Sequence, residues 1–300
     1  MYKAKITWLF CHFLFVGFIA NAQTDLSYQQ PPKSITDIVL ASPTPGVSID
    51  DNGEWMLISE RSDFPGIEQL AEPELRIAGL RINPENFGPS RSNYAIGFQL
   101  KNIQTGETFP VKGLPENLRA ANTSWSPDRK QIAFTHTTPE KISLWKINIA
   151  DKTASPVTND AINDVLGTTF AWAGNDVIIY KAVVKDLSKS PAKPKAPSGP
   201  VIQENLGKEA ASRTYQDLIK NPYDEALFEF YATTQLKRTD GKTLGSAALY
   251  NSVNVSPDNR FILTDKLKKP FSYLVPANGF AKSIEILDAQ TGALVKDVAQ

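Results

Sequence analysis

A short turn motif recurs along this chain of 300 residues and restricts what it can fold into. Its two clear copies read Ser-Pro-Asp at 126–128 and 256–258, each between a short β-like run and a strand of alternating apolar residues. Serine caps such a bend with its hydroxyl, proline presets φ at the second position, and aspartate tolerates the third. The motif therefore indicates hairpins of antiparallel strands.

Two weaker copies and a second pattern extend this repeat. Residues 47–57 hold a degenerate copy with Ser48 as the turn serine, and residues 170–179 hold the weakest copy, with Ala173 in that position. A strand followed by a Thr-Gly type of turn returns at 105–106, 151–153 and 291–292. Measured at the turn position, the successive copies lie 78, 47 and 83 residues apart.

These intervals favour one architecture. Strand, Ser-Pro-Asp bend, strand, strand, Thr-Gly bend and strand make one four-stranded antiparallel sheet, and such sheets arranged radially form a β-propeller. One interval matches a blade of roughly 40–50 residues, and the two longer ones allow a blade plus an insertion of about 35 residues. The sequence predicts an all-β fold, a partial β-propeller of about four to five blades. A β-sandwich whose hairpins share turn chemistry is the alternative.

The two insertions are expected at about 61–92 and 185–225. In the first, residues 68–75 predict a short helix interrupted at Pro73, and residues 76–82 predict a strand. The second begins with a flexible Lys/Pro linker at 188–200, which has too few large apolar side chains to offset its ordering entropy. Beyond it, residues 210–219 are expected to form a helix that ends ahead of Asn221-Pro222, and residues 228–233 a strand.

The first 22 residues have the pattern of a secretory signal peptide. Lys3 and Lys5 precede an apolar run at 6–19, and Ala20-Asn21-Ala22 supplies small residues before a cleavage point. The run is too short to span a bilayer of about 30 Å. We therefore expect an exported, periplasmic or extracellular protein, a mature chain at 23–300, and no membrane attachment after cleavage.

Composition argues against several function classes. The 32 Lys and Arg balance the 32 Asp and Glu, so no net field draws the chain toward nucleic acid. Cys11 and His12 lie in the predicted signal peptide, which leaves His136 as the sole histidine of the mature chain, expected to be structural or exposed. No Gly-x-Ser-x-Gly string, Cys pair, phosphate loop or dinucleotide fingerprint occurs. The sequence predicts no catalytic residue, no metal site, no cofactor and no nucleic-acid partner.

One charged cluster falls on an insertion. Glu72 and Glu74 lie beside Arg76 and Arg81, and arginine binds a carboxylate through two parallel hydrogen bonds. Arg76 and Arg81 are therefore the candidate substrate-binding residues. A solvent-exposed insertion held by its own salt bridges is the alternative.

Longer strings resemble bacterial and chloroplast glutamyl endopeptidases, a branch of the prolyl oligopeptidase family. They lie at 73–84, 199–205, 213–218 and 269–276, and the resemblance covers nearly the whole mature chain. It implies an N-terminal β-propeller that covers a C-terminal α/β-hydrolase domain with a Ser-Asp-His triad, filters substrates by size and helps to bind peptides. No catalytic residue of the family matches a position in this sequence.

The resemblance implies a non-catalytic function for this chain. We expect the substrate-gating and binding part of an exported serine peptidase, whose partners are a peptide substrate and a C-terminal hydrolase domain absent from this chain, and we expect this chain alone to be inactive. A stand-alone periplasmic β-propeller that binds or scaffolds other proteins is the alternative. An unclosed propeller would expose two flanks, so the isolated chain should be marginal in solution.

Overall fold

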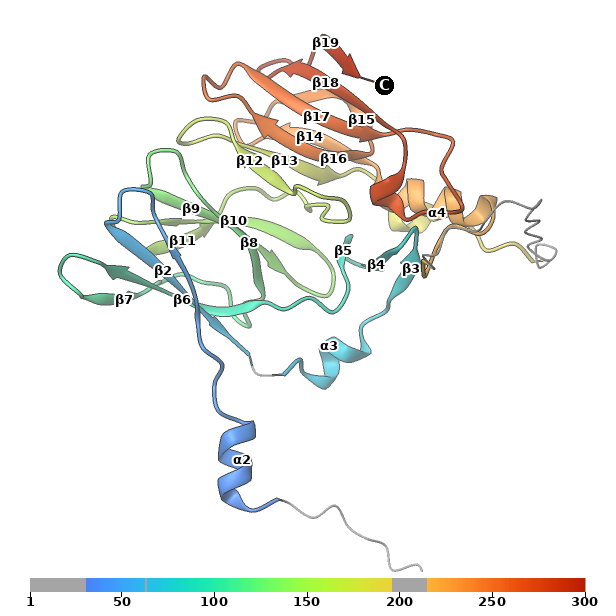
Figure 1. Ribbon diagram of the computed structural model, residues 1–300. Helices are drawn as coiled ribbons and strands as arrows, with labels where there is room; N and C mark the ends of the chain where they lie inside the picture. The colour runs from blue at the N-terminus through green and yellow to red at the C-terminus, as the bar shows by residue number, and fades with distance from the viewer. Residues whose placement is uncertain (1–30, 63, 196–214, 300) are drawn as a thin grey trace, which may run out of the picture. The chain divides into compact units, whose positions relative to one another are not determined.

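The computed structural model describes residues 31–62, 64–195 and 215–299 (Figure 1). The chain divides into two units, Met1–Ser42 and Pro43–Gln300. In the described part of the first unit, helix α2 (Lys33–Val39) has no buried residue. The predicted signal peptide at 1–22 lies outside the described residues. The second unit is mostly β and holds every strand of the described chain.

Four meanders, each of four antiparallel strands in chain order, make up most of the second unit (Figure 1). Meanders I and II are joined into one larger sheet by the single pair Ala95–Ala120. The prediction of a mostly antiparallel β fold is confirmed. The strands are β1 (Gly46–Ile49), β2 (Trp55–Arg61), β6 (Ala95–Asn102) and β7 (Thr108–Pro110) in meander I; β8 (Ala120–Trp125), β9 (Gln131–Thr137), β10 (Ile142–Asn148) and β11 (Thr153–Pro156) in meander II; β12 (Phe170–Trp172), β13 (Ile178–Val183), β14 (Thr234–Arg238) and β15 (Thr243–Ala248) in meander III; and β16 (Tyr250–Val255), β17 (Phe261–Leu267), β18 (Lys282–Asp288) and β19 (Leu294–Ala299) in meander IV.

The turn between the first two strands is built identically in meanders II and IV. Ser126 Oγ donates to Asp128 Oδ1 at 2.7 Å and accepts the N–H of Gln131 at 3.0 Å. Ser256 makes the matching pair of bonds at 2.6 and 3.0 Å. The serine thus bonds both arms of the bend, as the Ser-Pro-Asp motif predicts.

The two weaker copies differ in detail from the sequence prediction. In meander I, Asp50 and not Ser48 takes the serine position: its N–H donates to the carbonyl of Trp55, and its carboxylate accepts two N–H groups of the turn. Ser48 lies within β1, so the first interval is 76 residues rather than 78. The turn at Ala173 closes one residue earlier, from its N–H to the carbonyl of Val177.

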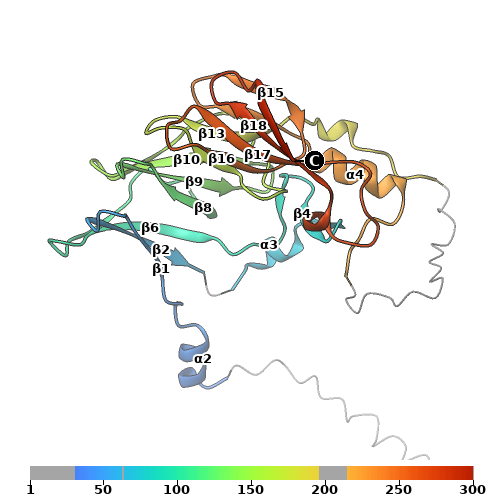
Figure 2. The same ribbon diagram turned by 45° about the horizontal axis from the view of Figure 1, so that its top comes forward.

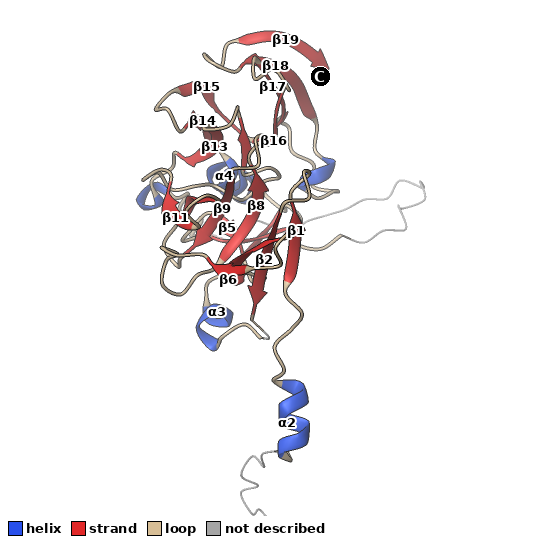
Figure 3. Cartoon of the chain, turned by 90° about the vertical axis from the view of Figure 1, so that its left-hand side faces the viewer, coloured by secondary structure: helices blue, strands red, loops and turns tan. Residues whose placement is uncertain are grey.

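The packing on the two faces of β9 shows the order in which the meanders are stacked. Ile132 and Phe134 pack with Leu57 and other residues of meander I, whereas Ala133 between them packs with Ile178 of meander III. Another apolar cluster joins meanders III and IV in the same way. The sheets therefore pack face to face in chain order (Figure 3).

The first insertion connects β2 to β6. It holds helix α3 (Ile67–Ala71) and a sheet of three strands, β3 (Leu75–Ile77), β4 (Leu80–Asn83) and β5 (Gly88–Pro89). The short helix is confirmed, but the single strand expected at 76–82 is wrong. Ala78 and Gly79 both have positive φ, 52° and 75°, and turn the chain into a two-residue hairpin.

The second insertion connects β13 to β14 and runs to Thr233, past the predicted limit of 225. It holds a 3-10 turn, η1 (Leu187–Lys189), and helix α4 (Pro222–Ala232). The strand expected at 228–233 is wrong, and the described part of the predicted helix, 215–219, contains no helix. Asn221 caps α4 by accepting the N–H of Asp224 at 3.0 Å, with Pro222 in the first turn. Of the predicted linker, 190–195 has no regular structure and 196–200 lies outside the described residues.

The two insertions share an apolar core with the connection between β17 and β18, which contains η2 (Ala277–Gly279). Phe228 of α4 lies at its centre, with ring centroids 5.1 Å from Phe271 and 5.5 Å from Phe280. Ile77 and Phe87 of the first insertion belong to the same cluster. All three segments connect the second and third strands of their meanders, and in an antiparallel meander such connections leave the same end of the sheet (Figure 2).

Candidate functional site

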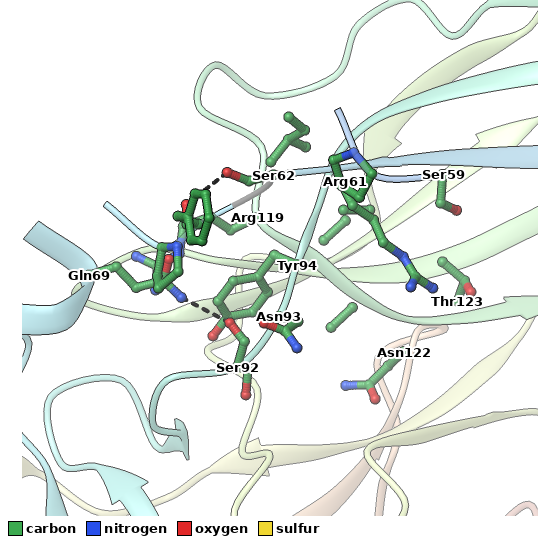
Figure 4. A pocket seen from close by; sticks show the side chains of 17 residues that line it. Ser59, Arg61, Ser62, Gln69, Ser92, Asn93, Tyr94, Arg119, Asn122 and Thr123 are labelled. Carbon is green, nitrogen blue, oxygen red and sulfur yellow. Dashed lines mark hydrogen bonds between the residues drawn. The ribbon is translucent and has the colours of Figure 1, made fainter. Parts of the chain in front are cut away.

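A cavity of about 600 Å³ lies in meanders I and II, at the end from which the connections between second and third strands leave (Figure 4). It forms where the last residues of β2 meet the first residues of β6 and β8, beside the first insertion. Strands β6 and β8 pair only at Ala95 and Ala120, so the sheet is open beside this pair. The cavity is lined mainly by polar side chains, among them Arg61, Gln69, Ser92, Tyr94, Arg119 and Asn122.

The first insertion is fixed against the cavity by polar contacts. Gln69 of α3 donates from Nε2 to the carbonyl of Ser92 at 2.9 Å. Arg119, which precedes β8, binds Glu72 through Nη1–Oε1 at 2.6 Å and Nη2–Oε2 at 3.3 Å. Its guanidinium also lies 4.8 Å from the ring centroid of Tyr94. The cavity wall thus carries an arginine whose charge Glu72 already neutralises.

Burial and ion pairing act in opposite directions on Arg119. Burial lowers its pKa, whereas the hydrogen bonds and charge of Glu72 raise it, and the net shift of the pKa is upward. The guanidinium therefore stays charged, and Glu72 is its fixed counter-ion.

Arg61 is the other arginine of the cavity, and its ion pairing differs from that of Arg119. Among the described residues, no carboxylate lies within 4.0 Å of its guanidinium, which packs instead against the backbone of Gly46. Arg61 is the last residue of β2 and is exposed. Sequence reasoning misses this residue, because its only signal is a charged side chain at the end of a strand.

The two arginines predicted from sequence lie elsewhere. Arg76 and Arg81 face each other across the β3–β4 hairpin, about half exposed, and neither lines the cavity. Arg76 is bonded to Glu74 at 2.6 Å, and Arg81 lies 3.9 Å from Asp217. These contacts match the salt-bridged alternative, and a substrate role for the two arginines stays a prediction.

His136 connects β9 to the cavity wall. It is buried, and its Nδ1 accepts the backbone N–H of Arg119 at 3.2 Å. Its ring meets Trp145 edge to face, with centroids 6.4 Å apart. Burial and the positive charge of Arg119 lower the pKa of His136, so the imidazole is neutral at pH 7. The expectation of a structural histidine is consistent with this position.

This histidine should make stability depend on pH. Because its folded-state pKa lies below the unfolded value of about 6.5, the unfolded chain takes up the proton first as the pH falls. The contribution is complete above pH 6.5 and is lost as the pH drops through the folded pKa. In His136→Gln, a neutral amide oxygen can accept the same N–H. Urea unfolding between pH 7.5 and 5.5 should show a smaller loss of stability for this variant, and equal losses would contradict the assignment.

A polar network extends from Asn122 in the cavity wall into the connection between meanders II and III. Asn122 donates to Asp164 Oδ2 at 2.8 Å, and Thr169 donates to the other oxygen of that carboxylate. Lys181 of β13 is fully buried, and its Nζ donates to the carbonyl of Leu166. Burial lowers the pKa of Lys181 to about 8 against the opposing charges of Asp164 and Asp265. Burial likewise raises the pKa of Asp164.

Metal-binding clusters and membrane-spanning helices are both absent from the described ranges. Within 31–62, 64–195 and 215–299, no group of three or more His, Cys, Asp or Glu side chains is placed to hold a metal ion. No helix in these ranges combines the length and the apolar character needed to cross a bilayer.

Two plant relatives confirm the resemblance seen in the sequence. A protein of Oryza sativa subsp. japonica described as "Probable glutamyl endopeptidase, chloroplastic" is 32% identical over 278 residues, which cover 87% of this chain and 30% of the relative. Its counterpart in Arabidopsis thaliana is 31% identical over 275 residues, 86% of this chain and 29% of the relative. This chain is homologous to glutamyl endopeptidases over most of its own length and spans less than a third of theirs. No protein-family model matches it.

Solved structures resemble this chain only remotely. An acylaminoacyl peptidase from Pyrococcus horikoshii superimposes with a TM-score of 0.43 at 10% identity, and the match covers 85% of this chain and 32% of the peptidase. TolB from Acinetobacter baumannii superimposes with a TM-score of 0.34 at 13% identity, and the match covers 89% of this chain and 56% of TolB.

Proposed function

We propose that this chain is the substrate-binding and gating part of a serine peptidase related to glutamyl endopeptidases. The homology over 87% of the chain carries this proposal. The sequence contains no nucleophile elbow, and in this proposal the peptidase chemistry belongs to a C-terminal α/β-hydrolase domain that these 300 residues do not include. The chain would admit and hold peptides for that domain.

We further propose that the meanders are successive blades of a β-propeller. The first strands of neighbouring meanders lie side by side: Trp125 Nε1 donates to Ser48 Oγ at 2.9 Å, and Trp172 Nε1 donates to the carbonyl of Ser124 at 3.2 Å. Neighbouring inner strands and sheets buried on both faces are what radial packing requires.

The outer face of meander IV supports the same arrangement. Counted from the turn serine, Leu263 of β17 matches Ala133 of β9. Ala133 is fully buried against the next meander, whereas Leu263 is 44% exposed. An apolar side chain thus lies where another blade would cover it.

The proposed function is tested by separating binding from cleavage. Labelled, unstructured peptides of about 15 residues should bind the 300-residue chain in a fluorescence anisotropy titration, and mass spectrometry should recover them intact. Hydrolysis that stays with the pure chain through gel filtration would contradict the proposed division of labour. Failure to bind any peptide would contradict the binding role.

We also propose that the protein is exported and loses residues 1–22. When the complete chain is expressed in a Gram-negative bacterium, the mature protein should begin at Gln23 and should be found outside the cytoplasm. Intact mass and N-terminal sequencing measure this directly. Ala22→Phe places a large side chain at the expected cleavage point and should leave the precursor uncleaved. Recovery of the unsubstituted chain with Met1 still attached would contradict export.

A further inference from the structure

The cavity beside β2 has the size and lining of a small ligand site. Its volume of about 600 Å³ lies within the usual range for such sites, roughly 300–1,000 Å³. Hydroxyl and amide groups of Ser92, Asn93 and Gln69 supply hydrogen-bonding positions in its wall. Such groups suit the polar backbone of a peptide better than an apolar ligand.

The charges in the cavity favour a negatively charged ligand. The charge of Arg119 is balanced by Glu72 at 2.6 Å, so this pair adds no net field. Arg61 has no carboxylate within 4.0 Å among the described residues, and it leaves the lining with one uncompensated positive charge. A planar guanidinium without a partner matches a carboxylate in shape and charge.

The other exposed arginines in this region are already engaged. Arg76 is bonded to Glu74, and Arg81 lies near Asp217, so a ligand would have to displace an existing partner. Among the residues that the structure describes, no carboxylate would have to be displaced from Arg61.

We propose that Arg61 binds a carboxylate of a peptide in this cavity, so that the chain prefers a peptide with that carboxylate over a matched neutral one. The inference rests on the proposed function and names the residue that would discriminate among peptides. The carboxylate has two sources in a peptide, a Glu or Asp side chain and the C-terminus. A single guanidinium can bind either through two parallel hydrogen bonds.

Three matched peptides test the proposal in a fluorescence anisotropy titration with the 300-residue chain. The first carries a central Glu and an amidated C-terminus, the second has Gln in place of the Glu, and the third keeps the Gln but has a free C-terminal carboxylate. A charge-assisted pair at a partly exposed site should give about tenfold tighter binding of the first or the third peptide than of the second. Whichever of the two gains identifies the source of the carboxylate.

Variants show whether Arg61 is responsible. Arg61→Gln should remove the preference while the second peptide binds as before, and Arg61→Lys should retain part of it, because lysine keeps the charge without the planar geometry. Arg76→Gln and Arg81→Gln are matched controls that also remove one exposed arginine, and both should keep the full preference. Since Arg61 is exposed, circular dichroism and urea unfolding should show that Arg61→Gln folds normally.

The outcomes separate this inference from the function on which it rests. Equal binding of all three peptides by the unsubstituted chain would overturn the role of Arg61 and leave the proposed peptide binding in place. A preference that survives in Arg61→Gln would overturn it as well. Failure of the chain to bind any of the three peptides would count against the proposed function itself.

Discussion

Phe228→Ala is expected to lower the free energy of unfolding by about 3–5 kcal/mol, as large-to-small changes of buried aromatic residues do. The Phe228 side chain is fully buried, with Phe271 and Phe280 packed edge to face against it. The substitution leaves a cavity between α4 and the β17–β18 connection that neither segment can fill without moving. The lost stability has two parts: the free energy of burying the Phe228 ring, and the van der Waals contacts that the surrounding rings lose at the cavity.

Two spectroscopic signals measure the loss of stability and show whether the insertion core and the meanders unfold together. The tryptophans of the described chain lie in meanders I to III, whereas α4 is the longest helix of the described residues and makes the largest single contribution to their helical signal in circular dichroism. If the insertion core and the meanders unfold together, urea transitions by fluorescence and by circular dichroism should coincide and shift equally. Phe64→Ala is the matched control, because Phe64 is 59% exposed and should change stability little. Similar shifts for both variants would contradict the assigned role of Phe228.

Lys181→Met should also destabilise the chain, by about 1–3 kcal/mol, which is the usual cost of leaving a buried acceptor without its hydrogen bond. The methionine fills a similar volume, but it leaves the carbonyl of Leu166 without its donor and Asp164 without a nearby positive charge. Asp164 would then be a buried carboxylate held only by Asn122 and Thr169.

The pH dependence of stability identifies Lys181 specifically. Its folded pKa of about 8 lies below the ordinary lysine value of 10.5, so the unfolded chain binds more protons between these values and stability rises as the pH increases. Urea unfolding between pH 8 and 9.5 should show this rise in the unsubstituted chain and not in Lys181→Met. The double variant Lys181→Met with Asp164→Asn should recover part of the lost stability. A double variant less stable than the single one would contradict the proposed coupling.

Local chemistry explains what can be predicted from the sequence. The Ser-Pro-Asp turns depend on residues within six positions of one another, so their bonds follow from the local sequence alone. The four-stranded meanders follow from the turn spacing. The copy in meander I lies two residues from its predicted alignment, because Asp50 performs the bonding that serine performs elsewhere.

The predictions that are wrong depend on tertiary context. Asn221-Pro222 is compatible with the end of a helix, but the same two residues favour a helix start, as N-cap and first-turn proline. Alternating Phe228 and Phe230 are typical of a strand, but in α4 they lie on opposite sides of the helix and both are buried in the insertion core. The hairpin turn at Ala78-Gly79 lacks the Asn or Asp that usually marks such a turn.

The candidate site cannot be located from the sequence. Arg61 and Arg76 both have carboxylates close by in the sequence, so the sequence does not show that, of the two, only Arg76 is paired with one among the described residues. The burial of Lys181 is equally hidden, since a lysine on a strand is usually exposed. A charged residue acquires its role here from its neighbours in space.

The insertion core has a consequence for how proteins of this type can diverge. Most of its apolar residues come from three connections that belong to three different meanders, and each covers surface that the others would otherwise expose. Deleting the β3–β4 hairpin alone would remove Ile77 and Ile82 from this cluster and uncover the apolar residues packed against them. Homologues should therefore gain, shorten or lose these three connections as a set, and insertions or deletions in one should be matched by changes in the other two.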